Sequence, residues 1–168
     1  MPDLLRPTSR VRQSFLQALA EFRAESRHRD LDPRVLAEPR TFDLYLEGLL
    51  AGTTMAPVGS GRVAQTVLWW IDGDTYLGRV SIRHALTEQL RRIGGHIGYE
   101  VRPSARRRGH GTTMLAAALP VALALGVDPA LVTCDAENLA SRRIIESAGG
   151  ELWGELDGEL RFWVPTAH

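Results

Sequence analysis

The fold is decided by the stretch His96-Ile97-Gly98-Tyr99-Glu100-Val101-Arg102-Pro103 and by the loop after it, Arg106-Arg107-Arg108-Gly109-His110-Gly111. In the first segment, apolar residues alternate with glycine and glutamate, which predicts a strand over residues 96–101. Pro103 ends this strand, because the residue before a proline is held extended. Residues 112–125 are apolar nearly all round, which predicts a buried helix after the basic loop. Pro120 is expected to kink or divide that helix.

The residues that follow complete a strand–helix–strand unit. The elements expected there are a short apolar strand at residues 131–134, a helix at 141–148 that ends at Gly149-Gly150, and a hairpin at 151–164 around Asp157-Gly158. The unit from His96 to Cys134 is predicted to be a right-handed crossover between two parallel strands.

The first half of the chain supplies helices and a hairpin. The expected elements are a short strand at residues 4–7, a helix from Val11 to about Arg29, a helix at 39–50, a loop at 55–62, a hairpin of residues 63–71 and 75–83, and a loop with one helical turn at 84–95. This order predicts an α/β (α+β) fold, in which helices flank a mixed central sheet. The length of 168 residues fits one domain, residues 1–168.

Composition excludes several classes of protein. The chain has 20 basic and 20 acidic residues, so its formal net charge is zero, and overall basicity gives no reason to expect a nucleic-acid partner. One cysteine, Cys134, cannot form an internal disulfide. No apolar run reaches the length of a membrane span, and no signal peptide is recognisable. We therefore expect a cytoplasmic protein without a membrane partner.

The basic loop has the physical properties of an anion site. The first N–H groups of a helix lack intrahelical partners, the helix dipole adds positive charge there, and glycines allow close approach of a bulky anion. A solvated loop with glycines that merely turn the chain is the alternative. Other phosphate motifs fit worse: every basic residue is Arg, so there is no Walker lysine, and Met114 stands where a dinucleotide fingerprint needs a third glycine.

The pattern formed by Arg106, Gly109 and Gly111 after a strand resembles the acetyl-coenzyme A loop of the GCN5-related N-acetyltransferases (GNAT). The preceding residues 98–103, the following Asn138-Leu139-Ala140-Ser141 and the closing Gly149-Gly150 extend the resemblance over residues 92–150. With residues 91–99 and 161–165 included, most of the chain is similar to a bacterial subgroup of predicted acetyltransferases. The resemblance implies the GNAT fold, in which two parallel strands of the central sheet splay apart.

The resemblance also implies which residues hold acetyl-coenzyme A. Backbone N–H groups of Arg107, Arg108, Gly109, His110, Gly111 and Thr112 would bind the pyrophosphate, and the Arg106 side chain would help. The pantetheine arm would lie between the splayed strands beside Tyr99 and pair with main chain near Val101, whose N–H is a candidate oxyanion donor. Asn138 and Ser141 would contact pantetheine and phosphate; alternatively, they are a helix N-cap and a first-turn residue. No metal is expected.

An amine acceptor must lose a proton before it attacks a thioester. Glu100 is the first candidate base; alternatively, it is a structural carboxylate paired to Arg102 or Arg83. Further candidates are His84, His96, Asp135 and Glu137. The family's usual acid, a tyrosine seven residues after the asparagine, is replaced here by Ile145, so the candidate acids are Tyr99, Cys134 or a water, unless the thiolate needs no help. A covalent route through Cys134 is a weaker alternative, because buried strand cysteines are usually inert.

The residues and the resemblance together predict an N-acetyltransferase that moves an acetyl group from acetyl-coenzyme A to an unidentified primary amine, on a small molecule or a peptide, by direct attack in a ternary complex. A non-catalytic acyl-coenzyme A-binding sensor or partner-binding module is the alternative, and transfer to oxygen or of a larger acyl group is a third reading. Two aromatic clusters, Trp69-Trp70 and Trp153 with Phe162 and Trp163, are expected in the core or in a homodimer surface at the β-rich C-terminus.

Overall fold

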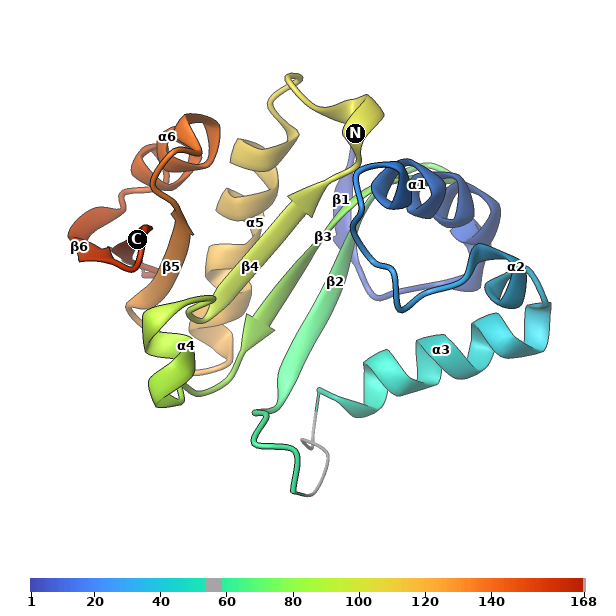
Figure 1. The fold of residues 1–168 in the computed structure, drawn as a ribbon, viewed down its shortest axis with the longest axis horizontal. Helices are drawn as coiled ribbons and strands as arrows, with labels where there is room; N and C mark the ends of the chain where they lie inside the picture. Colours follow the sequence, from blue (N-terminus) through green and yellow to red (C-terminus); the bar gives the residue numbers. More distant parts are fainter. Residues whose placement is uncertain (54–58, 168) are drawn as a thin grey trace.

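A computed structural model describes residues 1–53 and 59–167 (Figure 1). Part of the loop expected at residues 55–62 therefore lies outside the described residues. The strands are β1 (Asp3–Leu5), β2 (Gln65–Asp72), β3 (Thr75–Arg83), β4 (Ile97–Val101), β5 (Ala130–Asp135), β6 (Glu151–Leu156) and β7 (Glu159–Val164). The helices are α1 (Arg12–Ala24), α2 (Pro33–Leu36), α3 (Pro39–Ala51), α4 (Glu88–Arg92), α5 (His110–Ala124) and α6 (Leu139–Ser147), with 3-10 turns at Ser9–Val11 and Pro103–Ala105. The predicted mixed α/β architecture is confirmed.

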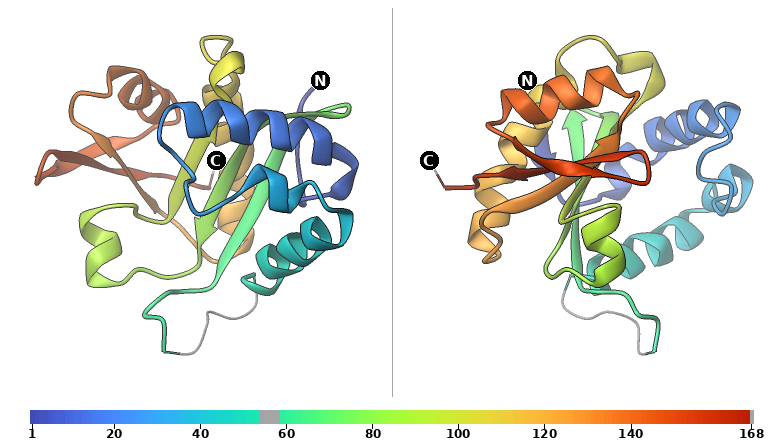
Figure 2. Two further views of the ribbon diagram at one scale, coloured as in Figure 1. Left: turned by 45° about the vertical axis from the view of Figure 1, so that its right-hand side comes forward. Right: turned by 60° about the vertical axis from the view of Figure 1, so that its left-hand side comes forward.

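Four antiparallel strands, in the order β1-β2-β3-β4, form the larger sheet. The β2–β3 ladder has one irregularity: Trp70 pairs with Gly78 and Ile71 with Tyr76, so Leu77 is skipped. Helices α1, α2 and α3 cover one face of this sheet, and α5 covers the other (Figure 2, left).

Each face of the larger sheet has its own apolar core. On the α1 side, the buried cluster includes Phe15 and Trp69, whose rings stack with centroids 4.8 Å apart. On the α5 side, Trp70, Val80 and Ile82 pack with the buried face of α5. Trp69, Trp70 and Phe162 are buried, as expected, whereas Trp153 is 47% exposed.

The smaller sheet has the order β5-β7-β6, and both of its ladders are antiparallel (Figure 2, right). Strands β4 and β5 run in the same direction but belong to different sheets (Figure 1). They meet only near their starts, where the His96 N–H donates to the Leu131 carbonyl at 2.7 Å. Beyond this point the strands diverge, so the splayed parallel strands of the expected fold are confirmed.

The close approach at this junction requires Gly95. Its φ of +59° is a left-handed conformation, and a Cβ added to it would collide with the carbonyl oxygen of Leu131. Glycine is the residue that tolerates both conditions. A side chain here would push the two sheets apart at the place where they are joined.

Some sequence expectations differ from the structure. Helix α1 ends at Ala24, not near Arg29, because Ser26 and His28 adopt φ values of +63° and +53° that a helix cannot continue. Helix α2 was not anticipated. Helix α5 is continuous through Pro120, so the expected division is wrong; its buried face holds it together although Pro120 cannot donate a hydrogen bond. None of the described helices is long and apolar enough to cross a bilayer.

Candidate functional site

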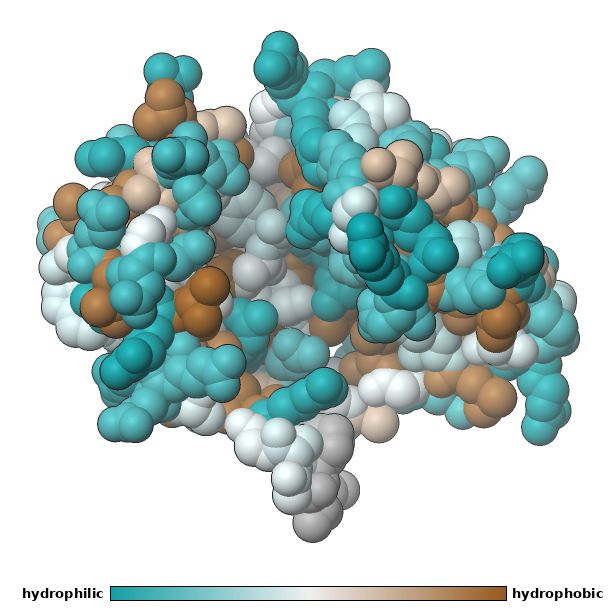
Figure 3. Space-filling model, viewed as in Figure 1, coloured by the Kyte–Doolittle hydropathy of each residue, from teal (hydrophilic) through white to brown (hydrophobic). Residues whose placement is uncertain are grey.

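A cleft of about 710 Å³ opens where β4 and β5 diverge. The space-filling view shows the surface hollowed between the two halves of the molecule (Figure 3). Its lining includes the predicted residues Tyr99, Glu100, Val101, Arg106, Arg107, Gly109, His110, Gly111, Thr112, Asn138 and Ser141. Of the residues predicted to bind acetyl-coenzyme A, Arg108 alone does not line it.

The basic loop places the N-terminus of α5 at this cleft. Gly109, with a φ of +81°, is the N-cap residue, and its backbone conformation is one that glycine readily adopts. The His110 ring points inward, since its Nδ1 accepts a hydrogen bond of 3.1 Å from Trp70 Nε1. His110 therefore offers a ligand its backbone, at the helix end where anions are stabilised.

Gly111 lets α5 lie close to α6. A Cβ at this position would lie 2.7 Å from Ile144 Cδ1. Ile144 and Arg143 of α6 also line the cleft, so the two helices form one wall of it. The sequence did not predict Arg143 as a site residue, because nothing in the sequence indicates that this side chain of α6 faces the loop.

Two arginines around the loop are held by the last turns of α1. Arg102 pairs with Glu21, with the nearest nitrogen and oxygen 3.0 Å apart, and Arg106 pairs with Glu25 at 2.8 Å. Glu25 lines the cleft. The hydrogen bonds from Arg106 lower the pKa of Glu25 despite the opposing effect of its burial. The arginine expected to help hold phosphates thus has a carboxylate partner in this structure.

Strand β4 turns backbone groups toward the cleft. In its ladder with β3, Arg102 N–H donates to the Leu77 carbonyl, and Arg83 N–H donates to the His96 carbonyl. Backbone groups of an antiparallel strand alternate in direction, so those of Tyr99 and Val101 face away from β3. The Val101 carbonyl accepts a hydrogen bond of 3.3 Å from Arg106 Nε. An extended amide chain between the strands would meet these groups.

Tyr99 and Ser141 bridge the cleft from opposite sides. The Tyr99 hydroxyl lies 2.6 Å from Ser141 Oγ. Burial raises the pKa of Tyr99 to about 12, against the smaller effect of the Ser141 hydrogen bond. Asn138 is the N-cap of α6, since its side chain accepts from Ser141 N–H at 3.1 Å, so the alternative reading of Asn138 holds alongside its place in the cleft. Ile145 is fully buried.

Cys134 is a buried residue of β5, and its thiol is not activated. Burial is the main effect that raises the pKa of Cys134 above its ordinary value. A thiol with a raised pKa holds little thiolate at neutral pH. This environment gives no support to a covalent route.

The Glu100 side chain lies on the face of β4 opposite to that of Tyr99. It is held by two residues of the segment that follows α1. Its carboxylate oxygens lie 2.8 and 3.0 Å from His28 Nε2, and Arg27 Nη2 lies 2.9 Å from Oε2. Burial raises the pKa of Glu100, but the His28 hydrogen bond and the neighbouring positive charges outweigh it and lower the pKa overall. The expected alternative partners, Arg102 and Arg83, are wrong: Arg102 pairs with Glu21, and Arg83 donates to the Gly94 and Gly95 carbonyls.

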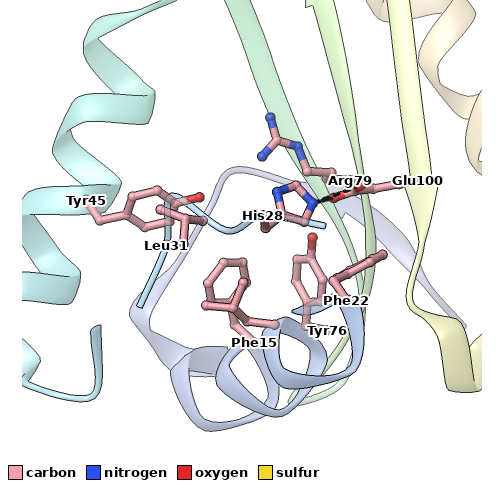
Figure 4. Close-up of a pocket in the computed structure, with 9 residues that line it drawn as sticks. Phe15, Phe22, His28, Leu31, Tyr45, Tyr76, Arg79 and Glu100 are labelled. Carbon is pink, nitrogen blue, oxygen red and sulfur yellow. Dashed lines mark hydrogen bonds and ion pairs between the residues drawn. The ribbon is translucent and has the colours of Figure 1, made fainter. Parts of the chain in front are cut away.

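A small cavity of about 10 Å³ adjoins Glu100 on the α1 side (Figure 4). It is lined by aromatic and apolar residues and by a few polar groups, namely Phe15, Leu19, Phe22, His28, Leu31, Tyr45, Tyr76, Arg79 and Glu100. Glu100 lines both the cleft and this cavity. It therefore stands between them.

Three of the other acid–base candidates, His84, His96 and Asp135, have structural partners. His84 Nε2 lies 2.8 Å from Thr66 Oγ1, and His96 Nδ1 accepts from Leu131 N–H. Asp135 accepts from Glu137 N–H. Neither these three nor Glu137 lines the cleft or the small cavity. Sequence reasoning missed His28, Glu25 and Arg27, which reach the site from an irregular segment far away in the chain.

The metal-ligating residue types do not gather anywhere in residues 1–53 and 59–167: no group of three or more His, Cys, Asp or Glu side chains is placed to hold a metal ion.

Comparison with solved structures finds the same fold in several acetyltransferases. *Mycobacterium smegmatis* RimJ, in complex with a coenzyme A disulfide, is 19% identical with a TM-score of 0.65, over 98% of this chain and 86% of that one. The microcin C7 self-immunity acetyltransferase MccE, in complex with acetyl-coenzyme A and AMP, is 14% identical with a TM-score of 0.63, over 95% and 89%. A *Salmonella typhimurium* acetyltransferase that modifies the N-terminal serine of ribosomal protein L7/L12 is 14% identical with a TM-score of 0.64, over 99% and 95%.

A search of curated proteins finds no significant match. The family model of the acetyltransferase (GNAT) domain, however, matches residues 11–151, which include the basic loop, β4 and both cleft-lining helices. The chain therefore belongs to the GNAT acetyltransferases, a family of N-acetyltransferases that use acetyl-coenzyme A.

Proposed function

We propose that this acetyltransferase moves an acetyl group from acetyl-coenzyme A to a primary amine by direct attack, with both substrates bound at once. The observation that carries the proposal is the cleft between β4 and β5, which has a helix N-terminus and arginines at one end and the outward-facing backbone of β4 along its side. Such a cleft fits a ligand with phosphates at one end and an extended amide arm.

Within this cleft the predicted residues have different roles. Backbone N–H groups of residues 107–112 and nearby arginines bind the phosphates, while Asn138 and Ser141 contact the arm. The Val101 N–H, on the face away from β3, stabilises the oxyanion that develops on the thioester carbonyl. Glu100 stands at the boundary with the small cavity, where an amine would approach.

Tyr99 is the proposed acid for the departing thiolate. With a pKa raised to about 12 by burial, its hydroxyl stays protonated at neutral pH. It occupies the cleft from β4, and its partner Ser141 comes from α6, the helix that carries Ile145 in place of the usual tyrosine. The phenol would thus come from β4, instead of from α6 as in the usual family arrangement.

The acceptor is proposed to be an amine on a small molecule or a peptide. The structural neighbours include an enzyme that modifies the N-terminal serine of a ribosomal protein. A peptide with a free N-terminal serine is therefore the first acceptor to test, together with amino acids, spermidine and an aminoglycoside. The buried Ile145 favours one alternative, a non-catalytic module that binds acyl-coenzyme A without transfer.

Two measurements test the proposal. Calorimetry with acetyl-coenzyme A is expected to show binding, and its absence at millimolar ligand would refute both readings. A thiol-release assay across the amines is expected to show turnover with at least one of them. Binding without thiol release for every amine would favour the non-catalytic alternative.

A further inference from the structure

His28 is held in one orientation by contacts on several sides. Its backbone has a φ of +53°, which is uncommon for a residue other than glycine and points to a constrained segment. Its ring packs edge-on against Phe22, with centroids 5.2 Å apart. Its Nε2 contacts both oxygens of Glu100, and the dashed lines in Figure 4 mark this pair. An imidazole fixed in this way presents its second nitrogen, Nδ1, in one direction.

The carboxylate determines which ring nitrogen carries the proton. Glu100 is charged at neutral pH, since its pKa is lowered, so it accepts a hydrogen bond and cannot donate one. Nε2 of His28 must therefore bear the hydrogen. In a neutral imidazole the other nitrogen, Nδ1, then carries a lone pair. Among the described residues, the hydrogen bonds of the ring all use Nε2.

The carboxylate itself is less suited to be the base. Glu100 is only 10% exposed, and its oxygens are already bonded to Arg27 and His28. A proton placed on it would break those pairs. His28 is more accessible, with 24% of its side chain exposed, and a proton on Nδ1 would keep the bond to Glu100 intact. A carboxylate behind a histidine also stabilises the imidazolium that forms.

The other charged and titratable groups here come from three elements. Arg79 of β3, Tyr76 of β3 and Tyr45 of α3 line the same cavity as His28, and Arg27 precedes His28 in the chain. Burial raises the pKa of both tyrosines, so they are neutral hydrogen-bonding groups at neutral pH. The cavity volume of about 10 Å³ is close to the space that one water needs. His28 lines this cavity and not the cleft, so a proton from an acceptor in the cleft would reach Nδ1 through one water.

We propose that His28 is the catalytic base of the transfer and that Glu100 is its positioning residue. The N–H bond of the acceptor ammonium breaks, and its proton forms a new bond to Nδ1 of His28. The freed lone pair attacks the thioester carbonyl carbon, and the C–S bond breaks. Tyr99 gives its proton to the departing thiolate and is reprotonated by the second proton, which the now cationic nitrogen loses. His28 then releases its proton to solvent, so the products are one acetamide, one thiol and one proton. This inference rests on the proposed function and assigns its proton transfer.

The first experiment compares three single variants with the wild type, using acetyl-coenzyme A and the best acceptor among an N-terminal serine peptide, spermidine and an aminoglycoside. His28→Gln keeps an N–H donor for Glu100 but cannot take up a proton, so kcat is expected to fall roughly 10²–10⁴-fold. The acidic limb of its pH–rate profile disappears, and the dissociation constant of acetyl-coenzyme A stays within twofold. His84→Gln, whose residue bonds Thr66 away from both cavities, is the matched control and keeps wild-type kcat.

Glu100→Gln distinguishes the two residues. If His28 is the base, the acidic limb remains in this variant, because the imidazole that takes up the proton is still present. If Glu100 is the base, the limb disappears in Glu100→Gln and persists in His28→Gln. That second pattern would overturn the proposal, as would a His28→Gln enzyme with kcat within threefold of the wild type.

The second experiment needs no acceptor. Long-range ¹H–¹⁵N NMR of the wild-type enzyme is expected to show the neutral His28 ring protonated on Nε2 and unprotonated on Nδ1. A ring protonated on Nδ1 overturns the proposal even if His28→Gln proves too unstable for kinetics. A wild-type enzyme that binds acetyl-coenzyme A but acetylates no amine contradicts the proposed function instead, and the NMR result still shows whether His28 is arranged as a base.

Discussion

The carboxylate of Glu25 accepts two hydrogen bonds from the guanidinium of Arg106, at 2.8 and 2.9 Å. The pair ties the end of α1 to the loop expected to bind phosphates. One helical turn earlier, Glu21 accepts from Arg102 and from the backbone and hydroxyl of Ser104. The loop is therefore fixed by carboxylates at two adjacent points. An incoming phosphate must compete with Glu25 for Arg106.

This competition predicts opposite effects for the two partners. Glu25→Gln is expected to tighten coenzyme A binding roughly two- to fivefold, in keeping with the ~0.5–1 kcal/mol of an exposed ion pair. Arg106→Gln is expected to weaken it, because a charge-assisted contact to phosphate is lost. Calorimetry at low and high salt measures both. Equal weakening by both substitutions would show that the intact pair, not the free arginine, supports binding.

Arg107 and Arg108 are a matched pair on the same loop, since only Arg107 lines the cleft. We expect Arg107→Gln to weaken coenzyme A binding several-fold and to flatten its salt dependence, because a positive charge facing the ligand is removed. Arg108→Gln is expected to retain most of the affinity, as its contribution is through the backbone. A larger loss in Arg108→Gln than in Arg107→Gln would contradict this assignment.

Tyr99→Phe removes the proposed acid and leaves the ring in place. We expect kcat to fall about 10–100-fold, within the lower range for a positioned acid or base, with little change in coenzyme A affinity. Because burial raises the pKa of Tyr99 to about 12, its loss of the proton should produce no alkaline limb in the wild-type profile below about pH 11. A wild-type limb near pH 10 that is absent from Tyr99→Phe would show an unperturbed phenol instead.

Gly95→Ala tests the junction of the two sheets. The substitution combines a strained φ, which costs roughly 1–2 kcal/mol, with a collision against the Leu131 backbone that adds about 1–3 kcal/mol. Gly73→Ala is the control, since Gly73 has a φ of +62° but open space around it, and it should show the first cost alone. Urea denaturation measures both. Equal destabilisation of the two variants would mean that the junction relaxes without resistance.

Glu100 contributes a pH-dependent part of the stability. Its pKa in the folded chain is lowered from about 4.5, so its stabilisation is present above that pH and is lost as the pH falls through the lowered value. Glu100→Gln is expected to destabilise the fold by about 1–3 kcal/mol at pH 7, since it removes the negative charge that accepts the hydrogen bonds from Arg27 and His28. The difference from the wild type should shrink by pH 3. A constant difference across this range would show that charge is not the cause.

The sequence predicted the elements whose cause is local. The sequence correctly placed the strand at residues 96–101, the turn at the basic loop and the apolar helix that follows it. Each of these elements depends on a pattern of only a few residues: the strand period, the glycines of the turn and the helical periodicity. The meeting of Tyr99 with Ser141 was not predicted, although both residues had been named. Their contact depends on how far two strands diverge, which no short segment determines.

His28 shows the limit more plainly. It lies in an irregular segment with no periodicity, and its partner Glu100 is 72 residues away in the chain. The sequence predicted that α1 continues to about Arg29, because Ser26 and His28 are not glycines and nothing in the sequence indicates their positive φ values. Once the helix is extended wrongly, the histidine points in an arbitrary direction. Only the packing of α1 against the sheet places it.

The residue skipped in the β2–β3 ladder has a further consequence. Along a regular strand, residues three apart point to opposite faces. Leu77 shifts this odd–even order, so that Tyr76 and Arg79 both point to the α1 side, while Val80 and Ile82 point to the α5 side. An unbulged strand would send either the phenol or the guanidinium into the opposite core. Tyr76 and Arg79 therefore line the same cavity as His28 because β3 contains one extra residue.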